Sequence, residues 1–207
     1  MKRKIRILIA DDHAVVRMGL SALLDLEPDM EVVAEAKNGE DAVQEARRTN
    51  PDIAILDLMM PKMDGVAATR KLLADNSSLR VVILTSFATA DGIAHALKAG
   101  ASGVIIKNTD NEKLVEAIRK AAAGESVIPA EIRRNISANP PVPALSPRQS
   151  DVLKSMTLGH TNKEIAKELG IGEDSVEQHV NVLLNKIGAS NRTEAVATAL
   201  RKHLLKI

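Results

Sequence analysis

The chain has 207 residues, of which 45% are hydrophobic and 27% charged, and its formal net charge is +1 at pH 7. This composition is typical of a soluble globular protein with one or two domains, and it excludes a protein that binds polyanions through bulk charge. The lack of Cys excludes disulfides and thiolate metal sites, and the lack of Trp and Tyr argues against base stacking on single-stranded nucleic acid.

The first residues do not have the pattern of a targeting segment. A short apolar stretch at 5–10 is interrupted by Arg6 and ends at Asp11 and Asp12. It is too short for a signal peptide or a membrane span. We therefore expect a cytoplasmic protein without membrane association.

Apolar runs and helical spacings alternate five times over the first 123 residues. Short apolar runs predict strands at 5–10, 31–36, 53–56, 81–84 and 103–106. Helical spacing predicts helices at 13–26, 40–48, 65–74, 90–99 and 110–123. This alternation predicts an α/β fold with a five-stranded parallel sheet, helices on both faces, and strand order 2-1-3-4-5.

The character of the sequence changes after residue 124. Residues 125–144 contain four prolines and no sustained period, which predicts a linker. Beyond it the pattern is all-α, with expected helices at 147–157, 162–169, 173–187 and 191–204. Ser146 and Thr161 begin capping boxes. The tight turn at 170–172 favours a helix-turn-helix in this second domain.

Polar side chains follow four of the five predicted strands. They are Asp11 and Asp12, Asp57, Thr85, and Lys107. A single Asp at a strand end is most often a turn or capping residue, and a single Lys is most often solvated. In the predicted topology, however, the strand ends meet in one crevice, so the set predicts a site.

The residue types at this site favour phosphoryl chemistry. Carboxylates about 4 Å apart repel by about 4 kcal/mol at an effective dielectric constant near 20, and a divalent cation removes that cost. Oxygen ligands without Cys favour Mg²⁺. Asp57 is the candidate nucleophile toward phosphorus. Lys107 would stabilise charge on the transferring oxygens, and Thr85 would donate a hydrogen bond to the new phosphoryl group.

These residues, with Met60-Pro61 and Asp64-Gly65 after the central Asp, resemble the receiver domain of bacterial two-component response regulators. The resemblance implies a flavodoxin-like (βα)5 domain over residues 1–124, phosphorylated on Asp57 by a sensor histidine kinase. It implies that Thr85 and Lys107 are switch residues and that the domain catalyses only its own phosphorylation and dephosphorylation. The Mg²⁺ ligands that it implies are Asp11, Asp12, Asp57 and the backbone carbonyl of Met59.

The chain departs from many receivers at one position. They carry an aromatic residue three positions before the lysine, and this residue rotates inward on activation. This chain has Val104 there. An aromatic rotamer switch is therefore excluded, which leaves the movement of Thr85 or a different dimer face.

The predicted helix 173–187 has two different sides. Its apolar side has the spacing of a core stripe, and the opposite side carries candidate base-reading residues. Those candidates are Glu177, Gln178, Asn181 and Asn185. The candidate phosphate contacts are Lys163, Lys167, Lys186 and Arg192. Polar residues on a helix are usually only solvated, but the preceding tight turn favours a recognition helix.

The segments 145–153, 159–166 and 169–171, with Val176 and His179, resemble the LuxR-type helix-turn-helix. Together with the receiver they resemble the NarL/FixJ class of response regulators. This implies a DNA-binding domain over residues 145–207, promoter DNA as a partner, a homodimer when phosphorylated, and regulation of transcription. Gly172 replaces the usual Ser cap, and Glu177 replaces a frequent Lys that would face DNA.

Two alternatives remain open at this point. A small-molecule phosphatase would share the Asp, Mg²⁺ and Lys chemistry, but the helix-turn-helix would then have no role. A regulator with the same DNA-binding domain that works without phosphorylation would keep full regulation after Asp57→Ala.

Overall fold

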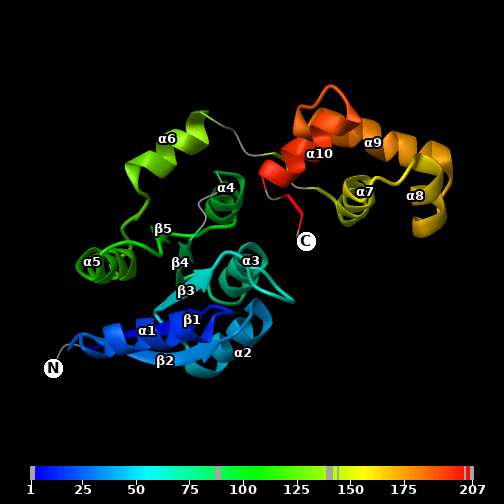
Figure 1. Cartoon of the computed structure of the whole chain (residues 1–207). Coiled ribbons are helices and arrows are strands. Elements are labelled where there is room, and N and C mark those ends of the chain that lie inside the picture. The colour runs from blue at the N-terminus through cyan, green and yellow to red at the C-terminus, as the bar shows by residue number, and fades with distance from the viewer. Residues whose placement is uncertain (1–2, 87–89, 139–141, 144, 203, 206–207) are drawn as a thin grey trace. The chain divides into compact units, whose positions relative to one another are not determined.

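The computed structural model describes residues 3–86, 90–138, 142–143, 145–202 and 204–205 (Figure 1). Contacts divide the chain into two compact units, Met1–Asn139 and Pro140–Ile207. Among the described residues, no helix combines the length and the apolar character that crossing a membrane requires.

The first unit is an α/β fold with one parallel sheet. Its strands are β1 (Ile5–Ala10), β2 (Met30–Ala36), β3 (Ile53–Asp57), β4 (Arg80–Thr85) and β5 (Gly103–Ile106). Its first five helices are α1 (Ala14–Asp25), α2 (Gly39–Thr49), α3 (Gly65–Asp75), α4 (Ala90–Lys98) and α5 (Asn111–Ala122). The strand order β2-β1-β3-β4-β5 confirms the predicted flavodoxin-like topology.

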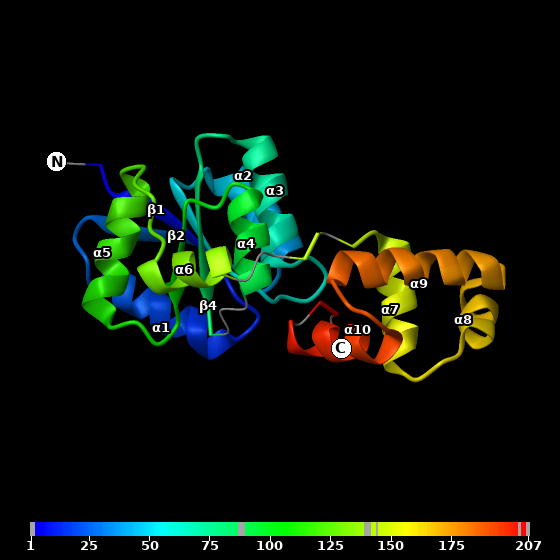
Figure 2. The same cartoon turned by 90° about the horizontal axis from the view of Figure 1, so that it is seen from above.

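Helices cover both faces of this sheet (Figure 2). Because side chains alternate along a strand, Ile7 and Ile9 pack with α1 and α5 on one face, whereas Leu8 and Ala10 pack with α2, α3 and α4 on the other. All five residues of β3 are buried, as expected for a central strand covered on both sides. The carboxyl ends of β1, β3, β4 and β5 therefore meet at one edge of a rigid sheet.

The turn after β3 is fixed by two residues. The side chain of Asp64 accepts a hydrogen bond from the backbone N–H of Ala67 at 2.8 Å and caps α3. Gly65 donates its backbone N–H to the carbonyl of Leu58 at 3.0 Å. A Cβ at Gly65 would overlap the carbonyl oxygen of Asp57, so only glycine lets the turn approach the strand end this closely.

The sequence predicts a linker at 125–144, but the first part of this range is folded onto the first unit. Residues Ala130–Ala138 form a helix, α6, and the first compact unit extends to Asn139. Ile132 and Ile136 are one helical turn apart and pack against the apolar cluster between the sheet and α4, and this burial stabilises the helix. Pro140 and Pro141 lie outside the described residues.

The second unit is all-α, as predicted. Its helices are α7 (Pro147–Thr157), α8 (Asn162–Leu169), α9 (Glu173–Ile187) and α10 (Arg192–Arg201), the last ending three residues earlier than expected. Ser146 and Thr161 form the two predicted capping boxes. Val176, Val180, Leu183 and Ile187 of α9 enter the core of this unit, which confirms the predicted apolar stripe.

Candidate functional site

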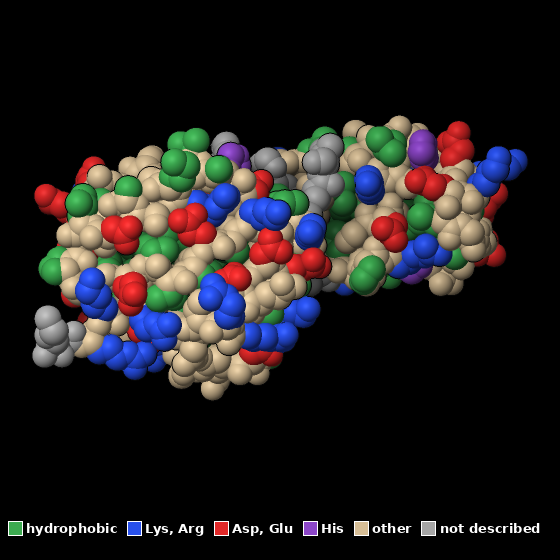
Figure 3. Space-filling view, turned by 90° about the horizontal axis from the view of Figure 1, so that it is seen from below, with side chains coloured by type: hydrophobic (Ala, Val, Ile, Leu, Met, Phe, Trp, Pro, Cys, Tyr) green, Lys and Arg blue, Asp and Glu red, His purple; other side chains and the backbone are tan. Residues whose placement is uncertain are grey.

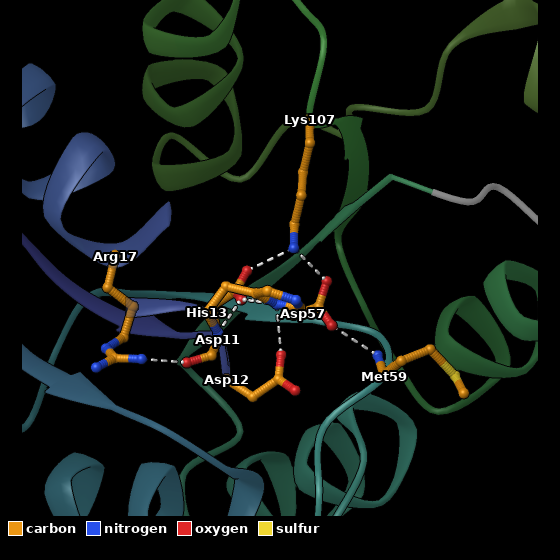
Figure 4. Close-up of polar contacts among 7 residues, drawn as sticks. All are labelled: Asp11, Asp12, His13, Arg17, Asp57, Met59 and Lys107. Carbon is orange, nitrogen blue, oxygen red and sulfur yellow. Dashed lines mark hydrogen bonds and ion pairs between the residues drawn. The ribbon is translucent and has the colours of Figure 1, made fainter. Parts of the chain in front are cut away.

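Three charged side chains meet at the carboxyl edge of the sheet (Figure 4). Lys107 follows β5, and its Nζ lies 2.6 Å from Asp11 Oδ2 and 2.8 Å from Asp57 Oδ1. Asp11 and Asp57 are only 1% and 6% exposed, although each sits at a strand end. One ammonium therefore bridges two buried carboxylates from neighbouring strands.

Burial and pairing act against each other in this cluster. Burial raises the pKa of the Asp57 carboxyl above its ordinary value, and although the hydrogen bond from Lys107 opposes it, the net shift is upward. Burial by itself lowers the pKa of the Lys107 ammonium. The hydrogen bonds to Asp11 and Asp57 outweigh that effect and leave the pKa of Lys107 above its ordinary value. Lys107 therefore keeps its positive charge, whereas the negative charge on Asp57 remains energetically unfavourable.

Asp12 and His13 extend the cluster toward solvent. His13 Nδ1 lies 2.8 Å from Asp12 Oδ1 and 3.2 Å from Asp11 Oδ1, and its side chain is 69% exposed. The backbone N–H of His13 also donates to Asp11 Oδ1 at 2.9 Å. His13 therefore orients both acidic side chains at the start of α1.

Arg17 supports the same loop from the side. One of its Nη atoms donates to the backbone carbonyl of Asp11 at 2.7 Å, and its Nε lies 3.5 Å from Glu35 Oε2 on β2. The side chain is 19% exposed. Arg17 thus ties α1, the end of β1 and β2 together directly behind the acidic cluster.

Thr85 and Met59 complete the predicted set. Thr85 is the last residue of β4, is 3% exposed, and accepts a hydrogen bond on its backbone carbonyl from the N–H of Lys107 at 3.0 Å. The backbone N–H of Met59 donates to Asp57 Oδ2 at 2.9 Å. Each residue predicted for the receiver site therefore lies at this edge of the sheet.

The cluster has the donor set of a divalent-cation site. Ligand atoms of Asp11, Asp12 and His13 lie within 4.8 Å of one another. The buried Asp11 Oδ2 accepts no hydrogen bond of standard geometry, although its ion pair with Lys107 spans only 2.6 Å. Lys107 is the partner of this oxygen, since opposite charges at this distance attract whatever the angle. The carboxylate oxygens of Asp11 and Asp12 are ligands that a hard divalent cation prefers.

The predicted DNA-reading residues form an exposed face on α9. Glu177, Gln178, Asn181 and Asn185 are all exposed, and so are Lys163 and Lys167 on α8. Figure 3 shows both positively and negatively charged side chains on the face of the molecule that it draws. Lys163 and Lys167 are exposed cations of the kind that contact DNA phosphates.

Two of the predicted phosphate contacts have internal partners instead. Lys186 is half-buried, and its Nζ donates to Gln149 Oε1 at 2.9 Å. Arg192 donates to Asn162 Oδ1 at 3.2 Å and to the backbone carbonyl of His160. Burial lowers the pKa of Arg192 below its ordinary value. These two cations join helices within the unit, which their spacing alone did not indicate.

His13 and Arg17 were not anticipated as parts of the site. The sequence does contain a signal for each. His13 is a third ligand-type side chain directly after two acids, and Arg17 lies one helical turn further along the same helix. Neither signal is specific without the fold.

Comparison with known proteins gives matches along the chain. A family model described as response regulator receiver domain matches residues 7–119, and one described as bacterial regulatory proteins, luxR family, matches residues 143–199. The transcriptional regulatory protein LiaR of Bacillus subtilis (strain 168) is 36% identical over 97% of this chain and 99% of its own length. The oxygen regulatory protein NreC of Staphylococcus epidermidis (strain ATCC 35984 / DSM 28319 / BCRC 17069 / CCUG 31568 / BM 3577 / RP62A) is 36% identical over 97% and 99%.

Solved structures give the same picture. The response regulator ChrA of a heme-sensing two-component system matches with a TM-score of 0.57 and 33% identity, over 98% of this chain and 99% of that one. The RcsB–DNA complex matches with a TM-score of 0.64 over 96% and 98%, but at 22% identity it supports the fold alone.

Proposed function

The chain belongs to the two-component response regulators, with a receiver domain followed by a LuxR-type DNA-binding domain, and from this premise we propose that phosphorylation of Asp57 controls its binding to DNA. The observation that carries the proposal is the Lys107 ammonium between the buried carboxylates of Asp11 and Asp57. A nucleophilic carboxylate beside a fixed cation suits phosphoryl transfer. The relatives named above are called regulatory proteins.

The phosphoryl group comes from a phosphohistidine of a sensor histidine kinase. A carboxylate oxygen of Asp57 forms a bond to phosphorus as the N–P bond breaks, and the electron pair of that bond leaves with the imidazole. Lys107 then shifts its ammonium from Asp57 toward the phosphoryl oxygens. The N–H of Met59, which donates to Asp57 Oδ2, holds the carboxylate in one orientation during attack.

Mg²⁺ is the cofactor of this proposal. The residues that would hold it are Asp11, Asp12, Asp57 and, through its backbone carbonyl, Met59. His13 and Arg17 orient the acidic loop. When bound, the ion supplies positive charge to the transferring phosphoryl oxygens. Thr85 donates its hydroxyl hydrogen to the phosphoryl group of the product. Its position at the end of β4 connects this contact to α4 and β5.

The output is binding to promoter DNA in the bacterial cytoplasm. The exposed face of α9 reads bases through Glu177, Gln178, Asn181 and Asn185, and Lys163 and Lys167 contact phosphates. Lys186 and Arg192 contribute less to DNA than the sequence suggested, because they have partners inside the unit. Phosphorylation favours a homodimer, so that two copies of α9 face paired half-sites.

The test begins with in vitro selection of bound duplex DNA by the full chain with acetyl phosphate and Mg²⁺. Affinity for the selected duplex and oligomeric state by light scattering are then measured with and without the phosphodonor, for wild type and Asp57→Ala. We expect tighter binding and dimerisation only in phosphorylated wild type. Equal affinity and equal oligomeric state in all four samples would contradict control by phosphorylation and favour a phosphorylation-independent regulator.

A further inference from the structure

Residues 125–138, called the strap below, fold back over the free edge of β5. Val127 forms a parallel bridge with Gly103. The N–H of Val104 donates to the carbonyl of Val127 at 2.7 Å, and the N–H of Val127 donates to the carbonyl of Ser102 at 3.1 Å. Because β5 is the last strand of the sheet, these bonds pair backbone groups that an edge strand leaves open.

The rest of the strap packs on α4. Ile132 is 7% exposed and belongs to the same apolar cluster as Val104 of β5 and Ile93 of α4. Ile128 and Ile136, each four residues from Ile132, pack against that cluster. Figure 2 shows α6 next to α4, and the two helices are in contact. The strap is thus anchored at two places, the edge of β5 and the surface of α4.

The anchor on β5 lies on the same strand that leads to Lys107 in the proposed phosphorylation site. Val104 and Lys107 lie in and just after the same short strand, about 10 Å apart at 3.3 Å per residue. The N–H of Lys107 is bonded to the carbonyl of Thr85, the residue at the end of β4. Lys107 and Thr85 thus lie at the site end of β5 and β4, and Gly103 and Val104 lie at the strap end of β5.

The fit of the strap against β5 leaves no slack. A Cβ placed on Gly103 would lie 2.6 Å from the carbonyl oxygen of Val127 and 2.9 Å from its Cβ. The two backbones therefore lie too close together for any side chain at position 103. A movement of β5 away from or toward the strap changes the hydrogen bond that Val104 donates to Val127.

We propose that the strap senses the state of Asp57 through β5 and α4, docking in the resting receiver and detaching when Asp57 carries a phosphoryl group. This inference rests on the proposed function. The oxygens of the phosphoryl group draw the Lys107 ammonium away from the Asp57 carboxylate and attract the Thr85 hydroxyl, which moves β5 and α4, the two elements that hold the strap. Val104 has no aromatic ring that could rotate to carry the signal. The change in position therefore passes through the backbone of β5. Once it detaches, the strap lengthens the connection between the receiver and the second unit.

The test is hydrogen–deuterium exchange of the full chain, with and without Mg²⁺ and beryllofluoride, a phosphoryl mimic. We expect the amides of Val104 on β5 and Val127 in the strap to exchange about tenfold faster with the mimic, because the hydrogen bonds that these two N–H groups donate open. The peptide around Asp57 reports whether the mimic has bound. Unchanged exchange of the strap in a protein whose Asp57 peptide responds would overturn the inference and leave the proposed function intact.

A variant without the mimic tests the anchor directly. Gly103→Ala places a methyl group against Val127, so we expect fast exchange of the strap in the resting protein. Gly19→Ala is the matched control, because a Cβ there meets nothing within 4 Å. If Gly103→Ala fails to fold, Ile132→Ala removes the anchor on α4 and is expected to give the same result. Wild-type exchange of the strap in a folded anchor variant would contradict the proposal.

The two failures are distinguishable. Loss of the response at the Asp57 peptide itself, together with DNA binding that ignores the phosphodonor, would refute the proposed function. A normal response at Asp57 and in DNA binding, with a strap that stays protected throughout, would refute only the strap.

Discussion

Lys107 Nζ lies 2.8 Å from Asp57 Oδ1 in a site where the lysine side chain is 15% exposed and the carboxylate 8%. The same ammonium lies 2.6 Å from Asp11 Oδ2. The lysine is therefore the only partner that these two acids share among the ion pairs of the described residues. Removal of the Lys107 ammonium is therefore expected to change the stability of the first unit.

Lys107→Met is expected to destabilise the first unit by about 3 kcal/mol without Mg²⁺, since removal of one partner leaves buried charge uncompensated. Added Mg²⁺ restores part of the loss. Because the chain lacks Trp and Tyr, urea unfolding is followed by circular dichroism. Lys113→Met is the control, since Lys113 and Asp110 form an ion pair that is 73% exposed on both sides. A midpoint equal in both variants would contradict the bridge.

Asp57→Asn is expected to stabilise the first unit at neutral pH without Mg²⁺. Because burial raises the pKa of Asp57 in the fold, its contribution to stability is complete below the ordinary pKa of aspartate and is lost as pH rises through the raised value. The advantage of Asn therefore grows as pH rises through the raised pKa. Melting temperature against pH measures it, and Mg²⁺ reduces it.

Asp110→Asn supplies the opposite sign for comparison. The hydrogen bond from Lys113 lowers the pKa of Asp110, so its contribution is present above the ordinary aspartate pKa and lost as pH falls. No advantage of Asn that grows with pH is expected there. An Asp57→Asn protein that is less stable than wild type at neutral pH would show that the fold does not destabilise the charged form of Asp57.

Gly172→Ser is expected to stabilise the second unit by about 0.3 kcal/mol. Gly172 caps α9 with φ −71° and makes no side-chain cap hydrogen bond, and a Cβ there meets nothing within 4 Å. Gly170→Ala in the same turn is the contrast. Gly170 has φ +64°, so alanine costs about 1 kcal/mol. Unfolding of the second unit, followed by circular dichroism, measures the stability change in both variants. Equal changes in stability would contradict the turn geometry.

The cations of the second unit are expected to separate into two classes. Lys163→Ala and Lys167→Ala each lower the slope of log affinity against log salt by about 1, with little change in stability, because both side chains are exposed. Arg192→Ala destabilises the unit by about 1 kcal/mol and leaves the salt slope unchanged, because Arg192 bonds His160 and Asn162. If Arg192→Ala lowered the salt slope and the two lysine variants did not, DNA would contact α10 instead of α8.

Much of the fold and of the receiver site could be predicted from sequence for a physical reason. Buried strands produce apolar runs, and the crossover rules place their ends together, so the sequence predicts that Asp57 and Lys107 lie at one edge of the sheet. The helix α6 was missed because its two core residues, Ile132 and Ile136, lie between prolines and depend on α4 for burial. The inward orientation of Lys186 was missed because periodicity does not reveal a partner 37 residues away.

The central claim is that Asp57 is the phosphoacceptor, and one chemical measurement tests it most directly. The full chain is incubated with acetyl phosphate and Mg²⁺ and reduced with borohydride, which converts an aspartyl phosphate to homoserine, and the modified residue is mapped by mass spectrometry. We predict homoserine at position 57 in wild type and none in Asp57→Asn. Homoserine at Asp11 or Asp12, or its absence from a folded wild-type protein, would contradict the claim.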